Sequence, residues 1–112
     1  MAVTISKNEN IDLGVHLIVV AFTAENDALV FKAPRATGMS IQSVGTHGTA
    51  TINIQGSNDG VTYVALPTAV SLTTAGIKSA AVADLSYLFY RVIELAAAAT
   101  LTAHVVWTEA GR

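Results

Sequence analysis

The stretch INIQGSNDGVTYVAL, residues 52–66, decides how this chain folds. Ile52 and Ile54 alternate with polar neighbours, and this period of two is typical of a strand with one buried face. The turn formers GSNDG follow at positions 56–60. They combine the free φ of glycine with Asn and Asp side chains that bond the backbone. The chain then returns to β-type composition until Pro67, so the stretch predicts a β-hairpin whose second strand ends there.

Strand-like segments separated by turns continue on both sides of this hairpin. They lie at residues 2–6, 15–23, 28–32, 39–44, 69–72, 76–82, 87–95 and 100–108. No segment has the 3.6-residue apolar stripe of a helix. The alanines at 96–99 favour helix by propensity but are too few to nucleate one, so we expect a bend there. The pattern predicts an all-β fold, an antiparallel β-sandwich or jelly-roll-like barrel of about seven to nine short strands.

The length of 112 residues predicts a single domain. We expect residues 13–112 to form the sandwich and residues 1–12 to be an N-terminal arm or edge strand. The chain has no cysteine, which excludes disulfides and thiolate ligands. Its first residues are polar and its apolar runs are short, so we expect neither a signal peptide nor a membrane segment, and synthesis in the cytoplasm.

Low charge is the unusual property of the composition. Asp, Glu, Lys and Arg make up 12% of the chain, against about 25% in ordinary soluble domains. So few charges leave much of the surface uncovered, and we expect a homo-oligomer or a component of a larger assembly. The alternative is a monomer with an Ala, Thr and Ser surface. The net charge of −2, without a basic run, argues against nucleic-acid binding.

Two predicted strands differ in their patterning. Residues 15–23, VHLIVVAFT, are apolar on both faces. This indicates either a central strand covered on both sides or a strand whose outer face meets a partner. Residues 100–108 alternate instead. The side chains predicted to face the core there are Leu101, Ala103, Val105 and Trp107, and those predicted to lie outside are Thr102, His104 and Thr108.

Aromatic residues in strands belong more often to the core than to a binding platform, so we expect Phe89 and Trp107 to be buried. Tyr63, directly after the hairpin turn, is the best exposed aromatic candidate. Arg91 is predicted to share a face with Tyr87 and Phe89, where its charge requires an acidic partner. The candidates are Asp84, Glu94 and a residue of a neighbouring subunit.

The sequence carries no motif that predicts catalysis or metal binding. Its histidines, His16, His47 and His104, lack the close spacing of typical zinc sites, although adjacent strands could pair His16 with His104. Asp59 is explained by turn geometry, and the alternating acids of a calcium loop are absent. There is no Gly-x-Ser-x-Gly elbow and no Ser-His-Asp order. We therefore expect no enzymatic activity, no metal and no cofactor.

Residues 50–66 together with 87–92, YLFYRV, resemble two groups of β-sandwich proteins. The first is a set of small virion proteins of tailed phages, including head decoration (cement) proteins, which are short, rich in Ala, Thr and Gly, and poor in charge. The second is the discoidin-like carbohydrate-binding sandwich, whose domains are longer and carry longer loops. The first resemblance implies a structural role on the capsid surface of a virion, commonly as a homotrimer on local symmetry axes.

The leading hypothesis is therefore a capsid decoration protein that binds and stabilises the shell of the major capsid protein, without nucleic acid or membrane. The alternative is a carbohydrate-binding or host-adhesion module that uses the hairpin tip. A coat or tail-tube protein ranks lower because the chain is short. The candidate partner-binding residues are Val3, Ile5, Asn58, Asp59 and Tyr63.

Overall fold

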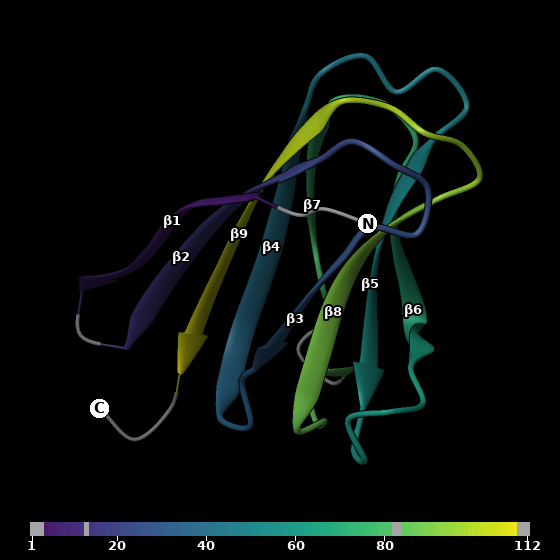
Figure 1. The fold of residues 1–112 in the computed structure, drawn as a ribbon. Coiled ribbons are helices and arrows are strands. Elements are labelled where there is room, and N and C mark those ends of the chain that lie inside the picture. The colour runs from purple at the N-terminus through teal and green to yellow at the C-terminus, as the bar shows by residue number, and fades with distance from the viewer. Residues whose placement is uncertain (1–3, 13, 82–83, 110–112) are drawn as a thin grey trace.

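The structure, a computed structural model, describes residues 4–12, 14–81 and 84–109. These residues form nine strands and no α-helix (Figure 1). The strands are β1 (Thr4–Asp12), β2 (Val15–Phe22), β3 (Ala28–Lys32), β4 (Ala36–Val44), β5 (Thr51–Ser57), β6 (Val64–Leu72), β7 (Gly76–Ser79), β8 (Phe89–Leu95) and β9 (Leu101–Glu109).

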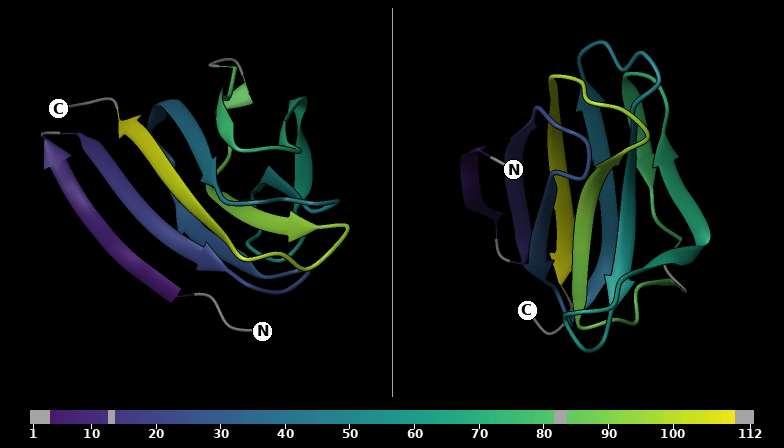
Figure 2. Two further views of the ribbon diagram at one scale, coloured as in Figure 1. Left: turned by 90° about the horizontal axis from the view of Figure 1, so that it is seen from above. Right: turned by 45° about the vertical axis from the view of Figure 1, so that its right-hand side comes forward.

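The strands pair into two antiparallel sheets. One has five strands in the order β1-β2-β9-β4-β7, and the other has four in the order β3-β8-β5-β6. Most consecutive strands lie in different sheets, and the order of β2 to β9 is that of a jelly roll. In Figure 2, β1 lies at the outer end of its sheet, away from β5 and β6 of the other. The predicted antiparallel sandwich is confirmed.

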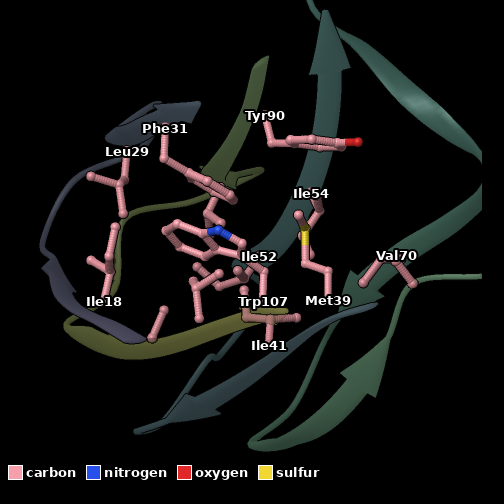
Figure 3. Packing of buried hydrophobic residues seen from close by; sticks show 14 of the residues in the cluster. Ile18, Leu29, Phe31, Met39, Ile41, Ile52, Ile54, Val70, Tyr90 and Trp107 are labelled. Atoms are coloured by element: carbon pink, nitrogen blue, oxygen red, sulfur yellow. The ribbon is translucent and has the colours of Figure 1, made fainter. Parts of the chain in front are cut away.

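A column of aromatic rings joins the two sheets (Figure 3). Trp107 of β9 stacks on Phe31 of β3 with ring centroids 4.6 Å apart, and Phe31 lies 5.9 Å from the ring of Tyr90 on β8. The alternation predicted for β9 is confirmed, because Leu101, Ala103, Val105 and Trp107 are all buried. Each sheet thus contributes its inward-facing side chains to one core.

The second strand of the hairpin departs from the sequence prediction. β6 begins at Val64 and continues through Pro67 to Leu72, so the prediction that Pro67 ends the strand was wrong. The register explains this, since Ile54 pairs with Val70 whereas Gln55 pairs with Ala65. Residues 66–69 therefore bulge out of the ladder, where proline loses no pairing hydrogen bond.

The strand β8 has the opposite phase to the one expected. Tyr90 and Val92 are fully buried, whereas Phe89 is half-buried on the outer face. The prediction that Phe89 belongs to the core was wrong, and Tyr90 takes that place. The strand ends at Leu95, and Ala96 adopts a φ of 75° in the predicted bend.

We predict that Gly56→Ala destabilises the fold. The aromatic ring of Tyr87 lies on Gly56, so an added Cβ would approach Tyr87 Cδ2 to 2.6 Å. Overpacking of this kind costs about 1–3 kcal/mol. Chemical unfolding followed by circular dichroism measures the loss.

The matched control is Gly76→Ala on β7, where an added Cβ meets nothing within 4 Å. We expect this variant to equal the wild type or to gain up to about 1 kcal/mol, because alanine restricts the unfolded chain. Equal stability of the Gly56 and Gly76 variants would contradict the packing of Tyr87 on Gly56.

Candidate interaction surfaces

The tip of the predicted hairpin is held by its own hydrogen bonds. Asp59 Oδ1 accepts the hydroxyl proton of Ser57 and the backbone N–H groups of Val61 and Thr62, each at 2.8 Å. Ser57 Oγ in turn accepts the backbone N–H of Gly60 at 3.0 Å. These bonds, the one from Val61 foremost, lower the pKa of Asp59 to about 2. The carboxylate therefore has a structural role at the tip.

Asn58 connects the hairpin tip to a distant segment. Its side-chain oxygen accepts the backbone N–H of Leu88 at 3.1 Å. The side chain is exposed, yet its carbonyl oxygen is occupied by this bond. Asn58 and Asp59 both lie at the hairpin tip, and their binding of a partner remains a prediction.

Tyr63 lies beneath the guanidinium group of Arg91, which is 4.7 Å from the ring centroid. Arg91 also donates from Nε to Gln55 Oε1 at 2.6 Å. The prediction of an acidic partner within the chain was wrong: an aromatic ring and an amide serve instead. Asp84 accepts the backbone N–H of Thr68 at 2.8 Å and so fixes the β6 bulge. Tyr63 is half-buried, and Arg91 covers one face of its ring.

The two candidates near the N-terminus differ in what the structure shows. Val3 lies outside the described residues. Ile5 is on β1, opposite Val20, and 47% of its surface is exposed. It remains a candidate contact of an edge strand.

The three histidines do not come together. His16 stacks on Trp107 at 5.1 Å, and its Nδ1 lies 3.4 Å from Glu109 Oε1. His104 lies opposite Val19 on the neighbouring strand, and His47 is buried in the loop after β4. The described parts of the chain contain no group of three His, Cys, Asp or Glu side chains that could hold a metal ion.

Sequence reasoning missed a buried Ser–His pair. His47 Nδ1 lies 3.0 Å from the carbonyl oxygen of Ala50, and Nε2 lies 2.6 Å from Ser43 Oγ. The carbonyl only accepts, so Nδ1 carries a proton and donates to it, and Nε2 of a neutral ring then accepts from the hydroxyl. Ser43 and His47 are 1% and 4% exposed. The pair therefore fixes the β4–β5 loop and does not present a nucleophile to a substrate.

The interior of the sandwich also holds two acidic side chains. Asp27 and Glu94 are fully buried, and the backbone N–H of Glu94 donates to the carbonyl of Asp27 at 3.0 Å. Asp27 Oδ2 accepts two backbone N–H groups, and Glu94 Oε2 accepts that of Ala99 at 2.6 Å. The other oxygen of each has no partner. Burial, reinforced by the charge of Asp27, raises the pKa of Glu94.

Four strands of the five-stranded sheet, β2, β9, β4 and β7, present an outer surface without charge. Alternation places one set of side chains outward on β2, β9, β4 and β7. We call this set the uncharged face: Val15, Leu17, Val19, Ala21, Thr102, His104, Val106, Thr108, Gly38, Ser40, Gln42, Val44, Ile77 and Ser79. It contains no Asp, Glu, Lys or Arg. The apolar patterning of residues 15–23 on both faces was its signal in the sequence.

The residues that the structure describes enclose no detected pocket. They also contain no helix that is long and apolar enough to cross a membrane.

Comparisons with known proteins support the fold. No protein-family model and no curated protein sequence matches the chain. Among solved structures, the SPBc2 prophage-derived protein YomS is similar with a TM-score of 0.60 at 8% identity, over 90% of this chain and all of YomS. The cupin domain of Schizosaccharomyces pombe Cnp3 has a TM-score of 0.55 at 9% identity, over 96% of this chain and 61% of that one. These likenesses support a jelly-roll fold and no more.

An iron(II) protein, HppE, shares the fold with a TM-score of 0.51 at 11% identity, over 85% of this chain and 44% of that one. The core of this chain is filled by side chains. Between its sheets lie the rings of Trp107, Phe31 and Tyr90, and the buried acids and His47 form no metal-binding group within the described residues.

We predict that Glu94→Gln stabilises the protein at neutral pH. The amide retains an acceptor for the Ala99 N–H, removes a buried charge and offers a donor. Relief of an unsatisfied buried group is worth about 1–3 kcal/mol. Because the pKa of Glu94 is raised in the folded state, this residue stabilises the fold at pH values below its ordinary pKa of 4.5. That stabilisation is lost as the pH rises through the folded pKa.

Urea unfolding of the wild type between pH 4 and 8 should show that loss, and Glu94→Gln should lack it. Glu25→Gln, at an exposed carboxylate in a turn, is the control and should follow the wild type. Parallel curves for Glu94→Gln and the wild type would contradict the assignment.

We expect Asp59 to give the unfolding free energy the opposite pH dependence. Its depressed pKa contributes stability above the ordinary value of 3.8, and the contribution disappears as pH falls toward about 2. Asp59→Asn keeps an acceptor oxygen but does not titrate. The difference in unfolding free energy between wild type and variant should therefore shrink from pH 5 to pH 2, and a constant difference would refute the role of the charge.

Proposed function

We propose that this chain is a structural protein of a phage particle, which decorates the capsid by binding the major capsid protein. The observation that carries the proposal is the low charge of the chain, of which Asp, Glu, Lys and Arg make up only 12%. A surface with so few charges is suited to burial against other proteins. The resemblance of the hairpin region to phage decoration proteins and the shared fold with a prophage-derived protein add support.

The mechanism would be binding by buried area. Flat sheet surfaces supply apolar contacts, and several weak contacts on a shell of repeated subunits sum through multivalency. The chain would act on the capsid surface of the virion, after synthesis in the host. We propose no catalysis, because the buried Ser43–His47 and Asp27–Glu94 pairs are 0–4% exposed and serve the fold.

The carbohydrate-binding alternative gains less support from the geometry. A sugar site at the hairpin tip needs free polar atoms beside an open ring. The side-chain oxygen of Asn58 and Oδ1 of Asp59 are bonded to the backbone, and Arg91 lies over Tyr63. No observation favours this function over particle assembly.

We predict that the chain is present in purified virions produced from the genome that encodes it, at a fixed ratio to the major capsid protein. Quantitative mass spectrometry measures that ratio. Shells assembled without the chain should bind the added protein in sedimentation, and should then melt at a higher temperature because binding stabilises the assembled state.

The control is the same chain after heat unfolding, which should remain in the supernatant. Absence of the chain from virions, or no binding to shells, would refute the decoration role.

A further inference from the structure

We propose that the uncharged face is an interface at which a second copy of this chain packs, sheet against sheet. The proposal goes beyond the capsid role and does not depend on it. At the centre of the face, Leu17 and Val106 lie directly opposite each other on β2 and β9, and Ser40 is the next residue in the same row. Val44 and Ile77 extend the apolar surface to the far strands, with 47% and 64% of their surfaces exposed.

The face is large enough for a specific contact. The strands β2, β9 and β4 have eight or nine residues each, and β7 has four. Strand spacing and rise then give about 14 Å by about 27 Å for the three long strands and about 5 Å by about 13 Å for β7, or roughly 450 Å² in projection, before the relief of side chains is counted. Stable complexes bury about 800 Å² per partner and incidental crystal contacts fewer than about 400 Å². The uncharged face therefore exceeds the size of an incidental contact and suits a dimer of modest affinity.

The absence of charge favours a second copy of the chain as the partner at this face. A surface without charged side chains brings no like charges together when it meets itself. The outer face of the four-stranded sheet differs, because it carries Lys32 beside Phe89 and Arg91 over Tyr63. Two copies meeting through that sheet would oppose these cations, and like charges in an interface are strongly unfavourable. Charged residues flank the uncharged face. The exposed residue Glu9 lies opposite Leu17 on the neighbouring edge strand β1.

Geometry favours a twofold dimer. A flat face that packs on its own copy makes an isologous contact, in which each partner uses the same patch. The two sheets would then stack about 10 Å apart, as sheets do within a sandwich. A homotrimer, which the resemblance to decoration proteins implies, needs two different patches on each copy. The uncharged face alone does not provide them.

Light scattering coupled to size-exclusion chromatography, with the intact chain at up to about 100 μM, tests the proposal. That concentration is a hundredfold above the Kd of about 1 μM that corresponds to a moderately tight complex. The wild type should be a dimer. Val106→Arg places two cations at the centre of the contact and should raise the dimer Kd at least about tenfold.

Val30→Arg is the matched control, since Val30 is a 53% exposed valine on a strand of the other sheet. It should remain dimeric. Circular dichroism and thermal unfolding verify that each variant folds. If Val106→Arg does not fold, Ile77→Glu replaces it, because the exposed side chain of Ile77 tolerates substitution and still lies on the face.

Three outcomes would overturn the proposal. The first is a monomeric wild type at the highest concentration, and the second is a trimer. The third is a dimer that dissociates with Val30→Arg and persists with the variants of the uncharged face. If the wild type is a monomer and Val106→Arg abolishes shell binding without unfolding the chain, the face contacts the capsid. The second-copy proposal then fails, whereas the proposed function stands.

Discussion

The column of rings that crosses the sandwich is the interaction on which the rest of the structure depends. His16 stacks on Trp107, Trp107 on Phe31, and Phe31 on Tyr90. Tyr90 meets the edge of Tyr87 at 6.1 Å. The column therefore runs from β2 and β9 of one sheet to β3 and β8 of the other. It fixes the separation of the layers, and offset or edge contacts between rings add to the burial of apolar area.

The end of the column explains a constraint on β5. The ring of Tyr87 lies on the backbone of Gly56, where no side chain fits. The Tyr90 hydroxyl accepts the backbone N–H of Tyr87 at 3.2 Å, so the segment before β8 is tied to the core. Asn58 bonds the neighbouring Leu88, and the hairpin tip is held against the same segment. The glycine that begins the turn motif in the sequence thus lies within β5, where close packing requires it, whereas Gly60, with a φ of 74°, serves the turn.

Sequence patterning predicted the all-β class and the inward face of β9 because hydrophobic alternation there is regular. It did not predict the phase of β8, because Tyr87 and Phe89 point to one side of an ideal strand and Tyr90 points to the other. Only the partner strands decide which of these aromatic side chains face the core. Pro67 was misjudged because a bulge depends on the register with β5. The arrangement of His47, Asp27 and Glu94 joins three segments that are distant in sequence, so no local spacing indicated it.

Several acidic residues lie in the interior of the protein and not on its surface. Of the eight Asp and Glu residues, Asp27, Asp84 and Glu94 are buried. Glu94 is fully buried, and this burial raises its pKa. The buried acids add no charge to the surface, so fewer than eight carboxylates are left there to repel other copies of the chain. The burial of these acids and the uncharged face therefore act in the same direction, toward association.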